Sequence, residues 1–146
     1  MYSSVTAVYS IGAAATGGRN GHTETTDHLV AVDLATPKEM GGPGLPGRAT
    51  PEHLFAAGYA ACFCGAIEFV QAQMKKNEHK PTVTSAVGIG AREAGGFGVT
   101  VKLRAENKGL PQAEFEAIVK KAHDEICPYS HATRGNISVD IEVVGA

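Results

Sequence analysis

Residues 58–70 read "GYAACFCGAIEFV", an almost wholly apolar stretch that carries two of the three cysteines in the chain. The stretch belongs to a predicted helix that begins at Pro51, with Thr50 as its N-cap, and ends near Lys76. At about 1.5 Å per residue this helix is roughly 39 Å long, which is long for a chain of 146 residues. We therefore expect a partner subunit to cover part of it.

Apolar side chains follow the helix in two rows at a spacing of about 3.6 residues. One row contains Leu54, Gly58, Ala61, Cys62, Gly65, Phe69 and Ala72. The other row contains Phe55, Tyr59, Phe63, Ile67, Val70 and Met74. A helix that is apolar nearly all round is typically buried on nearly every side.

The cysteines allow three interpretations: buried packing residues, as most free cysteines are, metal ligands, or a reactive nucleophile. Cys62 and Cys64 point about 200° apart on a helix, so they cannot bond each other or hold one ion together. One of them could still bind a metal ion together with His123 and Cys127, but the sequence contains no Cys-x-x-Cys pair to support this interpretation.

Two features favour the nucleophile. Cys127 precedes Pro128 in a segment of turn-forming residues, "CPYSHATRGN", which is not typical of a core cysteine. Arg19 lies in the glycine-rich turn "TGGRNG", where the backbone can approach another element closely. A cationic neighbour lowers the pKa of a thiol and so favours the reactive thiolate.

The rest of the chain predicts an α+β fold. Strand-like runs are expected at residues 3–10, 28–35, 82–93, 97–107 and 137–144, and the third and fourth form a hairpin. An amphipathic helix is expected over residues 110–126, with Phe115, Ile118, Val119 and Ala122 on one stripe. Residues 41–52 form a loop by composition, and residues 127–136 are expected to be irregular.

Composition excludes several classes of function. The formal charge of −2 gives no reason to expect nucleic acid or an acidic membrane surface as a partner. We expect no signal peptide, and the longest apolar run, residues 54–67, is shorter than a typical membrane span. We expect a cytoplasmic protein, in which three cysteines do not form a structural disulfide framework.

Four motifs together resemble a known family. They are "TGGRNG" (16–21), "PEHLFAAGYAACFCGAI" (51–67), "GGFG" (95–98) and "CPYSHATRGNI" (127–137), and they follow one another with matching gaps over essentially the whole chain. These motifs resemble the organic hydroperoxide resistance (Ohr) subgroup of the Ohr/OsmC family. The resemblance implies a single domain over residues 1–146 with antiparallel sheets packed around a long central helix, and an intertwined homodimer.

The resemblance also implies roles for four residues. Cys62 matches the cysteine that attacks the peroxide, and Cys127 matches the resolving cysteine. Arg19 and Glu52 match the arginine and glutamate of the same site, in which the glutamate holds the arginine by a bidentate pair. Cys64 has no counterpart in the motif, so we interpret it as a packing residue.

Three departures from the family pattern remove none of these groups. His131 replaces a common asparagine, Asn20 replaces a common aspartate, and residues 48–50 differ in the loop before Glu52.

The implied activity is the reduction of organic hydroperoxides through a sulfenic acid at Cys62 and a Cys62–Cys127 disulfide, without a cofactor or metal. The implied reductant is a dithiol, such as the dihydrolipoyl group of a lipoylated protein. Apolar walls are expected to favour alkyl and fatty-acid hydroperoxides, and the candidate wall residues are Phe55, Phe63, Phe97, Met40, Leu45 and Pro46.

Two alternatives stay open. One is an OsmC-like enzyme of broader peroxide preference, and the other is a redox sensor or small-ligand binder that does not turn over.

Overall fold

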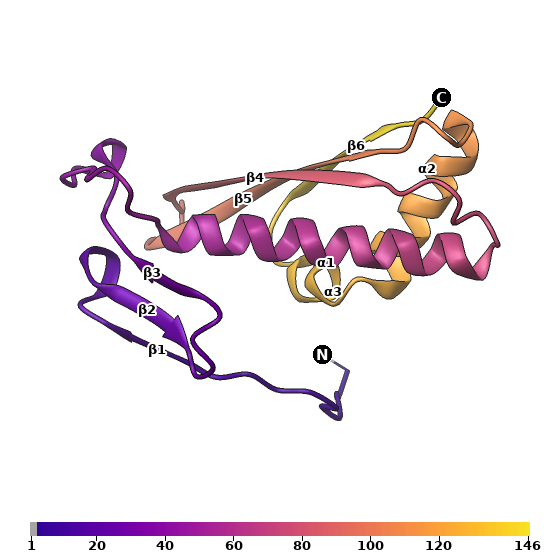
Figure 1. Cartoon of the computed structure of the whole chain (residues 1–146). Coiled ribbons are helices and arrows are strands. Elements are labelled where there is room, and N and C mark those ends of the chain that lie inside the picture. The colour runs from indigo at the N-terminus through magenta and orange to yellow at the C-terminus, as the bar shows by residue number, and fades with distance from the viewer. Residues whose placement is uncertain (1–2) are drawn as a thin grey trace. The chain divides into compact units, whose positions relative to one another are not determined.

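The computed structural model describes residues 3–146 (Figure 1). The chain divides after Pro51 into two compact units. That boundary is the first residue of the long helix α1, Pro51–Gln73. The expectation of a single domain over residues 1–146 stays a prediction.

The first unit is built on a small antiparallel sheet in the order β1-β2-β3. Its strands are β1 (Ala13–Thr16), β2 (His22–Thr25) and β3 (Ala31–Asp33). A short 3₁₀ turn, η1 (Gly18–Asn20), joins the first two strands.

The turn between β1 and β2 needs its glycines, as the sequence predicted. Gly17 and Gly18 have φ angles of 81° and 59°, in the left-handed region that glycine enters without strain. A Cβ atom at Gly21 would lie 1.8 Å from the carbonyl oxygen of Thr16, so no other residue fits there. Arg19 lies within this turn.

The predicted strand over residues 3–10 is wrong. These residues form no ladder, because no other strand of the described chain offers them hydrogen-bonding partners. Their apolar side chains are exposed: Val5 by 88%, Val8 by 100% and Tyr9 by 77%. The predicted run at 28–35 is confirmed in part by β3. A second 3₁₀ turn, η2 (Lys38–Met40), precedes the loop predicted over residues 41–52.

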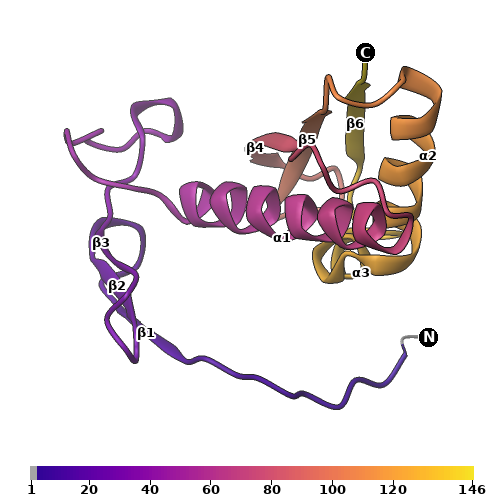
Figure 2. The same cartoon turned by 45° about the vertical axis from the view of Figure 1, so that its right-hand side comes forward.

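The second unit packs helices against a three-stranded sheet in the order β4-β5-β6 (Figures 1 and 2). The strands are β4 (Thr82–Ala91), β5 (Phe97–Glu106) and β6 (Val139–Val144). The remaining elements are α2 (Gln112–Lys121), the π-helical turn η3 (Ala122–Ile126) and α3 (Pro128–Thr133). The α+β expectation is confirmed.

The second sheet is mixed, whereas antiparallel sheets were expected. β4 and β5 form the predicted antiparallel hairpin, but β6 pairs with β5 in the parallel direction. A parallel pair needs a crossover connection, and here the crossover is the helical segment α2–η3–α3. The same crossover carries Cys127, which lies between η3 and α3.

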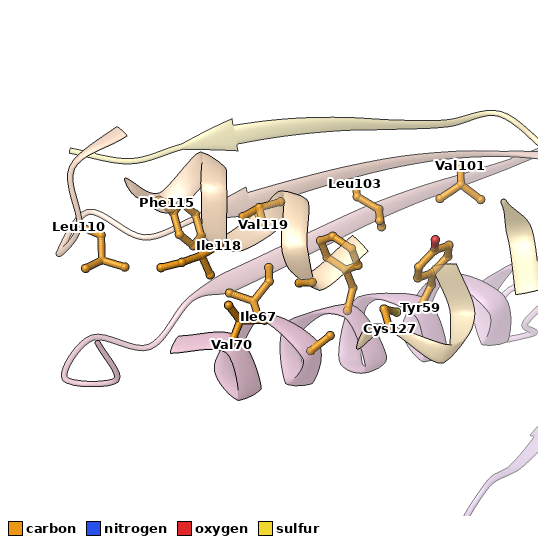
Figure 3. Packing of buried hydrophobic residues seen from close by; sticks show 14 residues of the cluster. Tyr59, Ile67, Val70, Val101, Leu103, Leu110, Phe115, Ile118, Val119 and Cys127 are labelled. Atoms are coloured by element: carbon orange, nitrogen blue, oxygen red, sulfur yellow. The ribbon is translucent and has the colours of Figure 1, made fainter. Parts of the chain in front are cut away.

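Only one of the two apolar rows of α1 is buried within this chain. Tyr59, Phe63, Ile67 and Val70 are completely buried and pack with the inner residues of β5 and α2, among them Leu103 and Phe115 (Figure 3). The other predicted row is open only in part: Leu54, Gly58 and Cys62 are half-buried, whereas Ala61, Gly65, Phe69 and Ala72 are exposed. α1 is long and apolar enough to cross a membrane by length and composition, but its buried row makes it the core helix of this unit.

The helix ends at Gln73, three residues before the predicted end at Lys76. Lys75 adopts a φ of 56°, and the amides of Lys75 and Lys76 bond to the carbonyl oxygens of Ala72 and Gln71. These bonds satisfy the last turn of the helix and stop its continuation.

The segment 127–136 is not irregular as predicted, because residues 128–133 form α3. Cys127 occupies the N-cap position with extended backbone angles, and Pro128 takes the first helical position, where its missing N–H costs nothing. The turn-forming composition that suggested a loop is therefore the start signal of a short helix.

Candidate active site

The sulfur atoms of Cys62 and Cys127 lie 3.8 Å apart. Cys62 lies in the middle of α1 and is half-buried, whereas Cys127 is completely buried at the junction of η3 and α3. A disulfide has an S–S distance of about 2.0 Å, so a combined movement of about 1.8 Å would join the two sulfurs. The structure thus brings the two predicted redox cysteines together from positions 65 residues apart.

The π-helical turn η3 sets the position of Cys127. The amide of Cys127 donates to the carbonyl oxygen of Ala122, a bond that spans five residues instead of the four of an α-helix. The wider turn ends α2 and lets the chain start α3 immediately, with Cys127 at the corner. In Figure 3, Cys127 lies beside Tyr59. Leu110 lies at the opposite end of the core.

Burial opposes the ionisation of Cys62. The removal of the thiol from water raises its pKa above the ordinary value, and the neighbouring Cys127 raises it further. A hydrogen bond from the backbone N–H of Tyr129 acts in the opposite direction, because it stabilises the thiolate. The net direction is upward, so these groups alone would leave Cys62 as a thiol at neutral pH.

Cys64 lies apart from this pair. Its sulfur donates to the carbonyl oxygen of Pro81 at 3.6 Å, at the start of β4. Burial raises the pKa of the Cys64 thiol, and the nearby carboxylate of Glu68 adds to the effect. The helix geometry that separated Cys62 from Cys64 in the sequence analysis is therefore confirmed, and Cys64 has the environment of a packing residue.

The aromatic ring of Tyr129 covers the α1 face next to Cys62. Its ring centre lies 6.4 Å from that of Phe55 and 5.6 Å from that of Tyr59. Gly58 makes this approach possible, because a Cβ atom there would lie 3.0 Å from the Tyr129 hydroxyl oxygen. Tyr129 is 40% exposed, so it forms an apolar wall that solvent and small molecules can reach.

The expected apolar wall needs one correction. Phe63 is completely buried in the core and cannot contact a substrate. Phe55 is half-buried beside Tyr129, whereas Phe97 is exposed at the start of β5, and the remaining wall residues stay a prediction.

Arg19 and Glu52 belong to different units. Arg19 lies in η1 of the first unit, and Glu52 lies in the first turn of α1. Ten residues of helix separate Glu52 from Cys62, a rise of about 15 Å, so the carboxylate cannot contact the sulfur. The approach of Arg19 to Cys62, and its pairing with Glu52, stay predictions.

A buried set of hydroxyl groups beside Cys127 escaped the sequence analysis. Tyr59, Ser130 and Thr133 are all buried; the Tyr59 hydroxyl contacts the hydroxyls of Ser130 and Thr133, and the Ser130 hydroxyl also contacts the His123 ring. The signal for this set was Tyr59, because a tyrosine in a buried apolar row needs a partner for its hydroxyl. The three-residue spacing of Ser130 and Thr133 then places both partners on one face of α3.

Among residues 3–146, no group of three or more histidine, cysteine or carboxylate side chains is arranged to hold a metal ion. His123 lies in the hydroxyl network described above instead of a ligand set.

Comparison with known proteins gives a consistent family. Residues 42–142 match the family model described as OsmC-like protein. The chain is 49% identical over 135 residues to the organic hydroperoxide resistance protein of Xanthomonas axonopodis pv. citri, an alignment that covers 92% of this chain and 93% of that protein.

Two solved structures are similar over almost the whole chain. One, from Legionella pneumophila, is described as an organic hydroperoxide resistance protein OsmC and is 50% identical, with a TM-score of 0.89 over 97% of this chain and all of that one. The other, an organic hydroperoxide resistance protein from Elizabethkingia anophelis, is 44% identical, with a TM-score of 0.90 and the same coverage.

The geometry predicts which cysteines form a disulfide. Mild oxidation of the reduced protein should join Cys62 to Cys127 and leave Cys64 free, because only the first two sulfurs are close to each other. Peptide mapping by mass spectrometry, after the free thiols are alkylated, would identify the linked pair. A Cys62–Cys64 or Cys64–Cys127 link in folded protein would contradict the arrangement.

Proposed function

This chain belongs to the OsmC-like family, and we propose that it acts there as a cysteine-based peroxidase that reduces organic hydroperoxides. Relatives named organic hydroperoxide resistance proteins support a role in resistance to organic peroxides. The observation that carries the proposed chemistry is the 3.8 Å separation of the Cys62 and Cys127 sulfurs, since attack and resolution need two thiols within reach of each other.

The proposed reaction has three steps. The Cys62 thiolate attacks a peroxide oxygen, the O–O bond breaks, and the leaving alkoxide takes a proton to become an alcohol, which leaves a sulfenic acid on Cys62. The Cys127 thiol then displaces water from the sulfenic acid and forms the disulfide. A dithiol, of which a dihydrolipoyl group is the proposed form, reduces the disulfide and restores both thiols.

Arg19 has a defined task in this proposal. Burial raises the pKa of Cys62, so the thiolate needs a cation that the Tyr129 N–H does not supply. A guanidinium beside the sulfur would favour the thiolate and also stabilise the alkoxide as the O–O bond breaks. Glu52, at the start of α1, would orient the guanidinium by a bidentate pair rather than contact the sulfur.

The proposed substrate class follows from the walls around Cys62. Phe55 and Tyr129 present aromatic surface, and the Tyr129 ring is partly open to solvent. Binding of an alkyl or fatty-acid chain is favourable because the chain and the aromatic rings bury apolar surface against each other. Hydrogen peroxide has no apolar part to place there.

We also propose that the protein is an intertwined homodimer located in the cytoplasm. The open row of α1 includes Phe69, which is 51% exposed, and the segment before β1 exposes Val5, Val8 and Tyr9. Apolar side chains on a helix face and on an unpaired segment are typical of surfaces that a second copy covers. In such a dimer the two units of each copy, residues 1–146, would form one structural domain.

A turnover assay tests the proposed function. With tert-butyl hydroperoxide and dihydrolipoamide, the wild-type protein should consume many equivalents of peroxide. Cys62→Ser should consume none, and Cys127→Ser should react once and keep a sulfenic acid that dimedone captures. Cys64→Ala is the matched control and should retain full turnover. A single stoichiometric oxidation of the wild type, with no reduction by dithiols, would indicate a sensor instead.

Substitution of Arg19 by lysine tests its role. Lysine keeps the charge but loses the planar fork that can face a carboxylate and a thiolate together, so Arg19→Lys should oxidise Cys62 about a hundredfold more slowly. Stopped-flow measurement of the second-order rate constant with an organic hydroperoxide would detect this loss. Glu52→Ala should lose less, because the guanidinium remains. A near wild-type rate for Arg19→Lys would make Arg19 a structural turn residue.

The dimer predicts a molar mass of twice that of the chain. Light scattering coupled to size exclusion at micromolar concentration should give about 30 kDa, since one chain has a mass of 15.1 kDa. Phe69→Glu, which puts a charge on the open row of α1, should weaken the dimer, and Glu93→Lys in the β4–β5 turn is the control. A fully active monomer would exclude the dimer.

A further inference from the structure

A chain of hydrogen bonds, buried at its centre, links three elements around Cys127. The His123 Nδ1 atom of η3 lies 2.8 Å from the Ser130 hydroxyl of α3. The Ser130 oxygen lies 3.0 Å from the Tyr59 hydroxyl of α1, which lies 3.1 Å from the hydroxyl of Thr133. Thr133 in turn donates to the carbonyl oxygen of Tyr129 at 3.0 Å.

The direction of these bonds follows from the number of protons available. A carbonyl oxygen only accepts, so the single Thr133 hydroxyl proton is used on Tyr129. Thr133 therefore accepts from Tyr59, and Tyr59, whose one proton is then used, accepts from Ser130. By the same count Ser130 accepts from His123. All of these hydrogen bonds can therefore form together only if His123 carries a proton on Nδ1.

This requirement selects one form of a neutral histidine. Burial lowers the pKa of His123, and the nearby guanidinium of Arg134 lowers it further, so the ring is neutral at neutral pH. A neutral imidazole carries its proton on either nitrogen, and the partner of one nitrogen decides which. The charged form also has a proton on Nδ1, so the chain persists when His123 is protonated.

Two residues of this hydrogen-bond chain flank, in the sequence, the groups that face Cys62. Cys127 and Tyr129, which supply the second sulfur and the backbone N–H, lie between His123 and Ser130 in the sequence. Arg134 closes the segment from the other side, because its guanidinium donates to the His123 carbonyl oxygen at 2.8 Å. The turn that carries both groups is thus held at each end.

We propose that His123, in its Nδ1–H form, is a positioning residue that acts through Ser130 and Tyr59 to hold Cys127 and the Tyr129 amide against Cys62. The inference rests on the proposed peroxidase function and adds a residue to it. His123 does not touch the peroxide, and its effect falls on the second step, in which Cys127 must meet the Cys62 sulfenic acid.

The test separates the two steps of one oxidation. After one equivalent of tert-butyl hydroperoxide, the formation of the Cys62 sulfenic acid and the closure of the disulfide are followed by rapid quench and intact mass. His123→Leu should close the disulfide about tenfold more slowly, the change expected when one hydrogen bond no longer fixes the geometry. Sulfenic acid formation should slow by less, and dimedone should capture more of it.

His123→Asn is the rescue variant, because its side-chain amide can donate from close to the position of Nδ1. It should restore most of the closure rate. Tyr59→Phe, which keeps the ring but interrupts the chain at its centre, should reproduce the slow closure of His123→Leu and serves if that variant fails to fold. Cys64→Ala, on the other face of α1, is the control and should close at the wild-type rate.

The outcomes distinguish this inference from the function on which it rests. If the wild type forms no Cys62–Cys127 disulfide, the proposed function is wrong. If the wild type forms it and both His123→Leu and Tyr59→Phe close it at the wild-type rate, with only a lower melting temperature, the positioning role is wrong. Nitrogen-15 NMR of His123 should show a protonated Nδ1, and a neutral ring protonated on Nε2 would also contradict the inference.

Discussion

The contact between Cys62 and Cys127 is the constraint on which the other features of the second unit depend. The two sulfurs come from elements that are distant in sequence, and they meet at 3.8 Å because a π-helical turn ends α2 early and starts α3 at once. The same crossover makes β6 parallel to β5, so the topology of the sheet and the position of Cys127 share one cause.

The packing around this pair of cysteines opposes the ionisation of Cys62. A thiol placed among aromatic rings and beside a second thiol ionises less readily, and burial raises the pKa of Cys62 accordingly. The Tyr129 amide compensates only in part. In the proposed function the missing charge comes from Arg19, which lies in a glycine turn of the first unit.

Much of the fold was predictable from local patterns, whereas features that depend on tertiary context were not. Periodicity predicted both apolar rows of α1 but could not tell that Tyr59 faces the chain's own core while Phe69 is left open. The motifs pointed to Cys62 and Cys127, whose sulfurs lie 3.8 Å apart, although their redox roles stay a proposal. The strand direction of β6 depends on the crossover, and the role proposed for His123 depends on a hydroxyl network from three elements, so neither has a signal at one sequence position.

The pH dependence of the first step tests the account most directly. The second-order rate constant for the oxidation of Cys62 by tert-butyl hydroperoxide would be measured in the wild type from about pH 5 to about pH 10, which brackets the range of thiol titration. If a cation holds Cys62 as a thiolate, the rate reaches its plateau at or below neutral pH. A rate that keeps rising into the alkaline range, as expected for a buried thiol without a cation, would contradict the account.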